Sequence, residues 1–430
     1  MNSRNGRPYT RRDALRFGGI GAAALGLAAC GVQGAAKQQS TAQAESAAGL
    51  TLAACGVQGA AKQQSTAQAE TAAQKFWKAQ KPTGAATFAN WALYIDPSHQ
   101  TLKDFTKATG IKVTYQEVIQ DDSSFFAKVH PQLSSGQSTG YDIMVITDGL
   151  EFNELVNLGE VIPLDQTRLT NFYKYSGTPY QHRSFDPGNV YSVPWASGST
   201  GIAWNPKYVK TPPTSINELW NPAYAGHVGM MSDVQEIANF GLFKIGVSPQ
   251  KSTEADWKNA AKALDQQKSA GIVRQYYDQS YINALSKGDT WITMAWSGDI
   301  FQQNLSAGTS LQFTVPQEGG TLWTDNMMIP KYAQNPVAAM EVIDWFYKPQ
   351  IAAMVTEAIN YITPVPSVQA IIQADAAKAT GSDKATLEQV ATSPLVWLTP
   401  ADYARLSPYV KITAQNRATF YSIFQPVVAG

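Results

Sequence analysis

The chain has few of the residues that build metal, disulfide and catalytic sites. Its 430 residues include 2 Cys and 4 His, too few for a disulfide scaffold and with little left for a zinc site. Charged residues make up 15%, and 33 basic residues balance 33 acidic ones, so no basic excess points to nucleic acid. We find no Gly-rich phosphate loop, nucleophile elbow or paired-His metal motif. These absences argue against an enzyme, a metal or cofactor site and a nucleic-acid partner.

What the sequence does have is length and aromatic rings. A chain of 430 residues is long enough for two or three domains, each with its own core. Its 11 Trp, 19 Tyr and 16 Phe make up 11% of the residues. This composition is typical of an aromatic-rich, charge-poor globular protein rather than a disordered or fibrous one.

The first 29 residues are typical of an export signal. Five Arg and one Asp precede an apolar run over residues 17–29, about half of the ~20 residues that a membrane-spanning helix needs. Residues 10–16 resemble the twin-arginine export motif, and residues 27–30 resemble a lipobox, in which Cys30 would be lipidated. The alternative is a chance stretch of small residues around a Cys. Removing residues 1–29 would leave 28 basic and 32 acidic residues, a net charge of −4.

An internal repeat follows the signal. Residues 27–45 recur unchanged as residues 52–70, a period of 25. A solenoid needs three or more copies, so a local duplication is the better interpretation. The second copy places Cys55 in another lipobox without a basic segment before it, which leaves Cys30 as the better anchor. We expect residues 30–82 to form a lipid-anchored flexible tether.

From residue 85 the pattern alternates between strands and helices. The first set is a strand at 87–91, a helix capped by Ser98 and ended by Gly110, a strand at 111–115, a helix at 125–133 and a buried strand at 141–146. The second set starts near residue 198, with a strand at 199–204, helices at 237–245 and 255–267, a strand at 291–295 and a helix from Asn335. This order predicts α/β units with parallel sheets, which bind ligands at the carboxyl ends of their strands.

Aromatic and acidic side chains gather at those predicted strand ends. They are Trp91 and Tyr94, Asp233 and Glu236, Trp296 and Asp299, Trp323 and Asp325, and Tyr361. Rings stack on methylene groups and attract cations, while carboxylates accept hydrogen bonds from ammonium groups. The pairing therefore favours a ligand with cationic ends and an apolar middle. The alternatives are structural: Trp91 and Tyr94 as core aromatics, Asp233 with Glu236 as a capping box, and Asp299 as a helix cap.

Several short motifs also occur in a characteristic order. They include Asn90-Trp91-x-x-Tyr94, Tyr141-Asp142, Leu219-Trp220-Asn221-Pro222 and Trp323-x-Asp325. Through them residues 85–430 resemble the spermidine/putrescine-binding proteins of ABC importers, within the bacterial extracellular solute-binding proteins. The resemblance implies a two-lobed, periplasmic-binding-protein-like (type II) α/β fold with crossing hinge strands. We expect lobe 1 to comprise residues 85–197 and 324–370, and lobe 2 to comprise residues 198–323 and 371–430.

The same resemblance implies a role for each clustered side chain. It implies that the aromatic residues line the polyamine slot: Trp91 and Tyr94 after the first strand, Trp296 and Trp323 as the rings that sandwich the polyamine chain, and Tyr361 from the late segment that returns to the first lobe. It implies that Asp233 and Glu236 hold one amine end of the ligand and that Asp325 faces an inner or far amine. Asp299 matches an acid found in the putrescine-preferring branch of the family. Two positions depart from the family, since Ala92 and Leu93 replace a small hydroxyl residue and an acid. Thr147 keeps the usual hydroxyl after the third strand, and Asp148 is a candidate replacement for the missing acid.

These observations predict a non-catalytic, monomeric receptor. We expect it to be exported, held by lipidated Cys30 at the outer face of the cytoplasmic membrane, and to deliver a polyamine to an ABC permease and its ATPase. The alternatives are a receptor for a quaternary amine, an opine or a sugar, a sensor with the same fold, or a secreted enzyme. The enzyme would need a catalytic set, yet His99, His130, His182 and His227 lie in no recognised motif.

Overall fold

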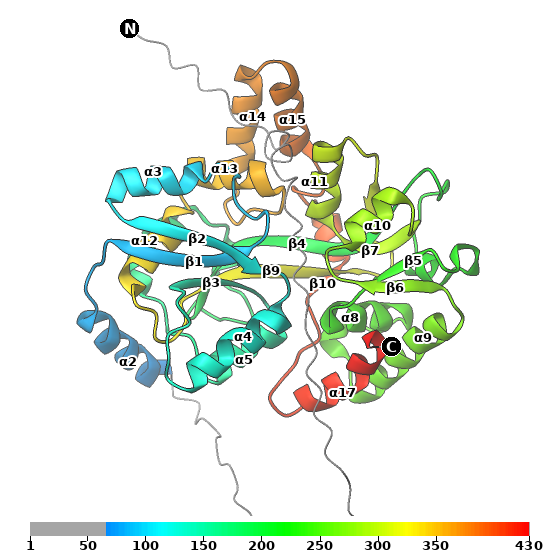
Figure 1. The fold of residues 1–430 in the computed structure, drawn as a ribbon, viewed down its shortest axis with the longest axis horizontal. Coiled ribbons are helices and arrows are strands. Elements are labelled where there is room, and N and C mark those ends of the chain that lie inside the picture. The colour runs from blue at the N-terminus through cyan, green and yellow to red at the C-terminus, as the bar shows by residue number, and fades with distance from the viewer. Residues whose placement is uncertain (1–65, 430) are drawn as a thin grey trace, which may run out of the picture. The chain divides into compact units, whose positions relative to one another are not determined.

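In this computed structural model the described residues are 66–429 (Figure 1). The expected signal peptide, the anchor Cys30 and the second lipobox at Cys55 lie outside them. Among residues 66–429, no helix combines the length and apolar character that crossing a membrane would require.

Ten strands within this range form one mixed sheet in the order β2-β1-β3-β9-β4-β7-β5-β6, with β10 beside β9 and β8 beside β4. Their bounds are β1 Ala85–Trp91, β2 Lys112–Ile119, β3 Ile143–Thr147, β4 Ser192–Trp204, β5 Val228–Met231, β6 Val273–Tyr277, β7 Ile292–Trp296, β8 Gln312–Thr314, β9 Gly320–Met328 and β10 Leu406–Ser407. β1 is parallel to β2 and β3, and β5 is parallel to β6 and β7. Each end of the sheet is therefore a parallel unit, as the alternating pattern predicted.

Two long antiparallel strands, β4 and β9, join the parallel units. β9 pairs with β3 from Asp325 to Met328, and β4 pairs with β7 from Thr200 to Trp204. The two strands also pair with each other along most of their length. They are the crossing strands of the two-lobed fold, and Figure 1 shows them running between the two ends of the sheet. One continuous strand, β4, replaces the shorter strand expected to begin at residue 199.

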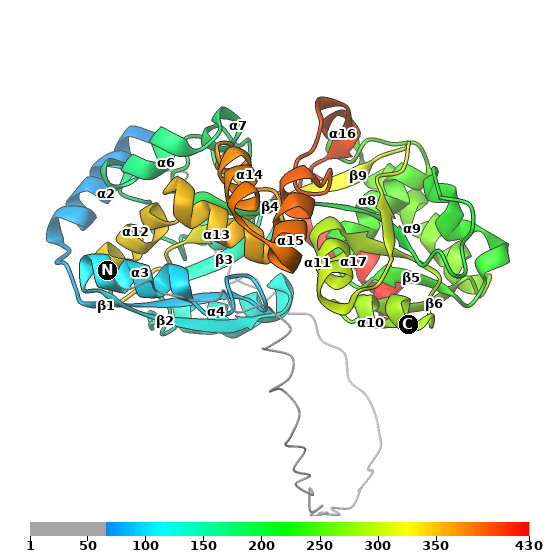
Figure 2. The ribbon, with the colours of Figure 1, turned by 90° about the horizontal axis from the view of Figure 1, so that it is seen from above.

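Helices cover both faces of each parallel unit (Figure 2). Their bounds are α2 Thr66–Ala79, α3 Gln100–Thr109, α4 Asp122–Ser134, α5 Leu150–Asn157, α6 Thr170–Tyr175, α7 Thr178–Gln181, α8 Val234–Lys244, α9 Glu254–Ser269, α10 Tyr281–Lys287, α11 Ser297–Ala307, α12 Pro336–Trp345, α13 Pro349–Ile359, α14 Val368–Lys378, α15 Gly381–Thr392, α16 Pro400–Ala404 and α17 Arg417–Val428. Short 3₁₀ turns at Gln166–Arg168, Ile216–Trp220, Pro222–Tyr224 and Pro249–Lys251 complete the loops.

The hydrophobic cores explain why these segments became strands. In β3, Ile143 and Val145 enter the core under α12 and α13, whereas Met144 and Ile146 enter the core under α4 and α5. Alternate side chains of a strand point to opposite faces of the sheet. A strand that is buried on both faces is therefore a continuous run of apolar residues in the sequence. A further core packs β5 and β7 against α8, α9 and α17.

Helix α3 begins from a different cap than the sequence predicted. Its N-cap is His99, at φ 51°, without a side-chain cap bond. The carboxylate of Asp96, rather than Ser98, accepts hydrogen bonds from the backbone N–H groups of Gln100 (2.5 Å) and Thr101 (3.3 Å). The Ser98 hydroxyl donates to the same carboxylate. An ionised carboxylate can accept several hydrogen bonds at once, so the Asp96 side chain, rather than the Ser98 hydroxyl, binds the N–H groups of the first turn of α3.

Two boundaries expected from the sequence differ from those that the packing of the helices gives. Helix α2 lies within the stretch expected to be tether, and Trp77 is buried there with its indole N–H donating to the carbonyl of Pro163 (2.9 Å). Val390 and Ala391 of α15 pack in the same core as α13, although residues 371–430 were assigned to lobe 2. The reason is local: α14 and α15 pack against each other and α14 packs against α13, so both helices stay with the first core.

Candidate functional site

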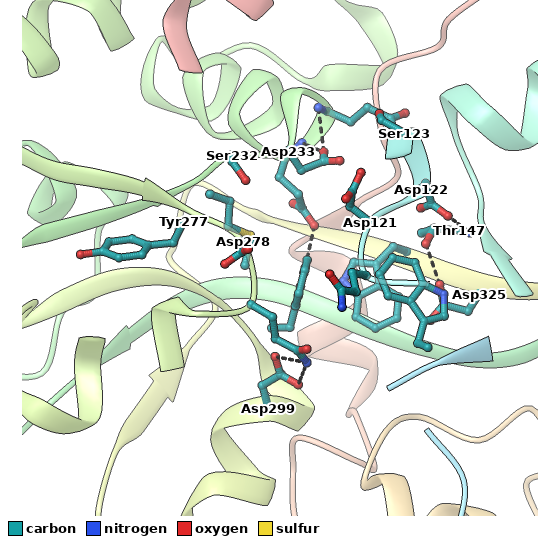
Figure 3. A pocket seen from close by; sticks show the side chains of 18 of the residues that line it. Asp121, Asp122, Ser123, Thr147, Ser232, Asp233, Tyr277, Asp278, Asp299 and Asp325 are labelled. Carbon is teal, nitrogen blue, oxygen red and sulfur yellow. Dashed lines mark hydrogen bonds between the residues drawn. The ribbon is translucent and has the colours of Figure 1, made fainter. Parts of the chain in front are cut away.

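A cavity of about 220 Å³ opens at the carboxyl ends of the strands. Its walls come from the segments that follow β1, β2, β3, β5, β6 and β7, and from β9 between them (Figure 3). It is lined by every binding side chain predicted from the sequence except Asp148: Trp91, Tyr94, Thr147, Asp233, Glu236, Trp296, Asp299, Trp323, Asp325 and Tyr361. Chain reversal through helices brings successive parallel strands to the same edge, which gathers these distant segments.

The indole rings of the cavity have their polar edges bound to protein. Trp91 donates to a backbone carbonyl of β3 (3.2 Å), Trp296 to Glu236 Oε1 (3.1 Å) and Trp323 to Thr200 Oγ1 (3.2 Å). With the N–H groups occupied, the rings have only their apolar faces to offer. Such faces stack on methylene groups and attract cations.

Asp325 lies on β9, in the middle of the sheet, and is buried. Its Oδ2 accepts from the Tyr94 hydroxyl (2.5 Å) and its Oδ1 from the Thr147 hydroxyl (2.7 Å). Burial raises the pKa of Asp325 to about 6, although both hydroxyls act in the opposite direction. Tyr94 combines its two predicted roles, since it lines the cavity and also belongs to the first core.

Asp233 and Glu236 mark the first turn of α8, on the other side of the cavity. Asp233 is the N-cap and accepts from the N–H groups of Gln235 (2.8 Å) and Glu236 (2.9 Å). The capping interpretation is correct for Asp233 but wrong for Glu236, which does not return a bond to the cap. Burial, and then the Glu236 carboxylate, raise the pKa of Asp233 to about 7.

The Glu236 carboxylate is bound at only one of its oxygens. Oε1 accepts from Thr200 (2.6 Å), Trp296 (3.1 Å) and the hydroxyl of Tyr409 (2.9 Å). Oε2 is buried without a hydrogen-bond partner among the described residues. Burial raises the pKa of Glu236 despite the three donors. A buried carboxylate oxygen without a donor destabilises the folded protein, so a proton or a cation bound to Glu236 Oε2 would be stabilising.

Asp299 is held by two tyrosines. Its Oδ1 accepts from Tyr361 (2.8 Å) and its Oδ2 from Tyr281 (2.9 Å). The N-cap of α11 is Trp296, so the prediction that Asp299 caps this helix is wrong. Burial first, and then the Asp299 charge, hold the pKa of both phenols well above the ordinary value, which keeps them as hydrogen-bond donors.

Asp148 lies outside the cavity. Its Oδ1 accepts from the backbone N–H of Thr324 (2.5 Å), and the Thr324 carbonyl accepts from the N–H of Asp148 (2.8 Å). This carboxylate therefore clamps the end of β3 to β9, and burial raises its pKa to about 7. The structure gives no support to Asp148 as a replacement for the acid missing at Leu93, because its carboxylate points to the backbone of β9.

Several cavity residues were not predicted from the sequence. They are Gln120, Asp121, Asp122, Ser123, Tyr277, Asp278, Gln279 and Tyr409 among others. A signal was present for two groups of them, because residues 120–123 directly follow β2 and residues 277–279 begin at the last residue of β6, and both strands are parallel to their neighbours. No local signal marked Tyr409, which reaches Glu236 across 173 positions of sequence.

The charge of the lining is one-sided. Seven carboxyl residues line the cavity: Asp121, Asp122, Asp233, Glu236, Asp278, Asp299 and Asp325. Figure 3 labels the Asp residues among them. No Lys, Arg or His is among the described lining residues. In the described part of the chain, no group of three His, Cys, Asp or Glu side chains is placed to hold a metal ion. The described lining therefore combines several acids with no basic side chain to balance them.

Helix α17 contacts α5 beside the cavity. The Tyr421 hydroxyl donates to Glu151 Oε1 (2.9 Å), and Arg417 forms an ion pair with Glu154 (2.8 Å). Between α5 and α8, the N–H of Leu150 donates to the side chain of Gln235 (2.8 Å). Because α17 and α8 pack in the core of β5 and β7, these bonds tie the segment after β3 to the other parallel unit.

The position of the Trp323 ring depends on Gly198, its partner in the β4–β9 register. A Cβ at residue 198 would collide with the Trp323 ring. We expect Gly198→Ala to displace the ring, to destabilise the protein by about 1–3 kcal/mol, as overpacking does, and to weaken ligand binding about threefold to tenfold. Thermal unfolding and titration calorimetry would measure both effects.

A matched control for this variant is Gly84→Ala. Gly84 has no atom within 4 Å of the added Cβ and is not among the residues that line the cavity. It should change neither stability nor affinity by a measurable amount. If Gly198→Ala behaves like the control, the proposed dependence of the ring on this glycine is incorrect.

Comparison with known proteins identifies the family. Residues 100–381 match the family described as bacterial extracellular solute-binding protein. The chain is 31% identical over 282 residues to the spermidine/putrescine-binding periplasmic protein of Salmonella typhimurium, covering 64% of this chain and 76% of that protein. It is 29% identical over 287 residues to the putrescine/cadaverine-binding protein of Pseudomonas aeruginosa, covering 64% and 78%.

A solved structure supports the fold assignment. The spermidine/putrescine ABC transporter substrate-binding protein PotD of Streptococcus pneumoniae aligns with a TM-score of 0.66, at 23% identity, over 80% of this chain and 98% of that one. The two-lobed α/β fold predicted from the sequence is thereby confirmed. The chain belongs to the bacterial extracellular solute-binding proteins, a family of binding proteins and not of enzymes.

Proposed function

We propose that this protein is the substrate-binding component of an ABC importer and that it captures a polyamine such as putrescine or spermidine. The observation that carries the proposal is the cavity lining: seven carboxyl residues and several aromatic rings, without a basic side chain among the described residues. Buried carboxylates without cations are costly, and so are buried ammonium groups without anions. A polyamine in this cavity would satisfy both.

The two sides of the cavity supply partners for the two ends of such a ligand. One terminal ammonium would bind Asp325, and the other would bind Glu236 Oε2, the buried oxygen without a partner. The N-terminus of α8 disfavours a cation, but Asp233 already accepts from the N–H groups there and offsets that effect. Each charge-assisted hydrogen bond would contribute about 1.5–3 kcal/mol.

The rings suit the methylene chain between the ammonium groups. Trp296 and Trp323 would stack on it, with Trp91, Tyr94 and Tyr361 closing the remaining walls. The cavity volume of about 220 Å³ is below the ~300–1,000 Å³ of pockets for drug-sized molecules. A slender linear ligand fits this volume better than a bulky one.

The names of the relatives agree with this ligand class. Proteins about 30% identical to this chain are named for the binding of spermidine, putrescine and cadaverine. We further propose that the protein acts as a monomer, is exported, is anchored by a lipid on Cys30 and hands its ligand to a membrane permease driven by an ATPase. Mass spectrometry of the mature N-terminus would test the anchor.

A thermal-shift panel tests the ligand class. Putrescine, spermidine, spermine or cadaverine at about 100 times its Kd should add about 2.7 kcal/mol to the free energy of unfolding and raise the melting temperature by several degrees. Maltose, glycine betaine and an opine should leave it unchanged. Stabilisation by one of these three, with no response to any polyamine, would replace the polyamine proposal with that ligand class.

A further inference from the structure

The start of α4, just after β2, brings two acids to the cavity that were not predicted from the sequence. Asp121 and Asp122 line the cavity beside Ser123, on the same side as Asp325 and Thr147 (Figure 3). The two acids differ in surroundings. Asp121 is exposed, whereas Asp122 has only 8% of its surface exposed.

The carboxylate of Asp122 is poorly satisfied by the protein. Its Oδ1 accepts a hydrogen bond from the backbone N–H of Thr147, and at 3.3 Å this bond is long. Asp121 by contrast is engaged as the N-cap of α4, accepting from the N–H (2.7 Å) and the hydroxyl (2.6 Å) of Ser124. Asp325, a neighbour of Asp122, accepts from two hydroxyls.

The charges nearest to Asp122 have the same sign. Burial first, and then the carboxylates of Glu151 and Asp325, hold its pKa well above the ordinary value. Glu151 already accepts from Ser123 (2.7 Å) and Tyr421 (2.9 Å), so it has its own donors. A buried carboxyl group that has a long hydrogen bond, two acidic neighbours and a place in the cavity lining either keeps a proton or receives a cation.

The residue at the usual acid position cannot fill this role. Leu93 is 58% exposed at the cavity, with φ at 56°, and brings no charge. Asp148 is bound to the backbone of β9. On this side of the cavity, Asp122 is thus the buried acid that stands beside Asp325.

We propose that Asp122 forms an additional cation subsite, which binds a third ammonium group and favours triamines over diamines. The inference rests on the proposed function and adds the number of charges on the ligand. A diamine would use Asp325 and Glu236 and leave Asp122 protonated. A triamine would place an additional ammonium group against Asp122 and displace that proton to solvent.

Titration calorimetry with spermidine and putrescine tests the subsite. Asp122→Asn should weaken spermidine binding about tenfold and putrescine binding less than threefold. Asp265→Asn is the control, because it removes one charge from the exposed surface of α9, outside the cavity lining; it should change both affinities less than threefold. Equal losses for both amines in Asp122→Asn, or no loss for spermidine, would overturn the subsite.

A second measurement needs no variant and therefore holds even if Asp122→Asn folds poorly. Calorimetry of the unaltered protein near pH 6 in two buffers of different ionisation enthalpy counts the protons released on binding. Spermidine should release about one proton more than putrescine, and equal release would contradict the proposal. A protein that binds neither amine would instead disprove the proposed function, so the two failures are distinguishable.

Discussion

Replacing Asp325 by asparagine is expected to lower the affinity for putrescine and spermidine between tenfold and a hundredfold while the protein stays folded. The change removes one charge at the centre of the sheet and keeps the shape of the side chain. A charge-assisted hydrogen bond contributes about 1.5–3 kcal/mol, which corresponds to this range of affinity. Titration calorimetry gives the affinity and thermal unfolding reports the fold.

The fold should survive because asparagine can still accept from one of the two hydroxyls. Tyr94 and Thr147 each hold one oxygen of Asp325, and one of these bonds can remain. Asp265→Asn is the control, since Asp265 is exposed on α9 and absent from the cavity lining. Affinity within twofold of the unaltered protein in Asp325→Asn would remove this residue from the binding site.

The second large effect is the pH dependence of binding. Burial raises the pKa of Asp325 to about 6 and that of Asp233 to about 7, so at pH 5 both hold a proton in the free protein. Aliphatic amines with pKa near 10 keep their charge throughout this range. If both carboxyl groups are ionised in the complex, the affinity should rise about a thousandfold between pH 5 and pH 8, roughly tenfold from Asp325 and a hundredfold from Asp233.

Calorimetry at pH 5, 6, 7 and 8 would measure this rise. The Asp325→Asn variant should show a pH dependence that is smaller by about tenfold, because one of the two titrating groups is gone. A constant affinity over the whole range would mean that neither carboxyl group changes its protonation on binding.

The stability of the ligand-free protein should change in the opposite direction. Both pKa values are raised above the ordinary 3.8, so the folded protein holds protons that the unfolded chain has already released between about pH 4 and pH 7. The free energy of unfolding therefore falls as pH rises through this window. A bound polyamine offsets the loss, so the thermal shift it produces should grow with pH.

The sequence could predict the α/β units because their signals are local. The run at β3 is apolar on both faces, and the strand is buried on both faces. Side chains after parallel strands were expected to share one edge, and Trp91, Asp233 and Trp296 indeed line one cavity. These predictions needed only the period of a strand and the direction of its neighbours.

The partners of each carboxylate could not be predicted in this way. Asp299 is bound by Tyr361, 62 positions away, and Glu236 by Tyr409, 173 positions away. Local interpretation could offer these two acids only a role in helix capping as the structural alternative to ligand binding, because it compared near neighbours in sequence. The same limit applied to Asp148, whose partner Thr324 lies on a distant strand.

The sequence by itself determined that the chain folds into parallel α/β units with aromatic and acidic side chains at their strand ends. The tertiary structure alone decided which acids have both oxygens bound by protein donors, as in Asp299, and which keep a buried oxygen without a partner among the described residues, as in Glu236. The physical reason is that strand formation follows local periodicity, whereas the hydrogen-bond partners of a buried carboxylate are set by long-range packing.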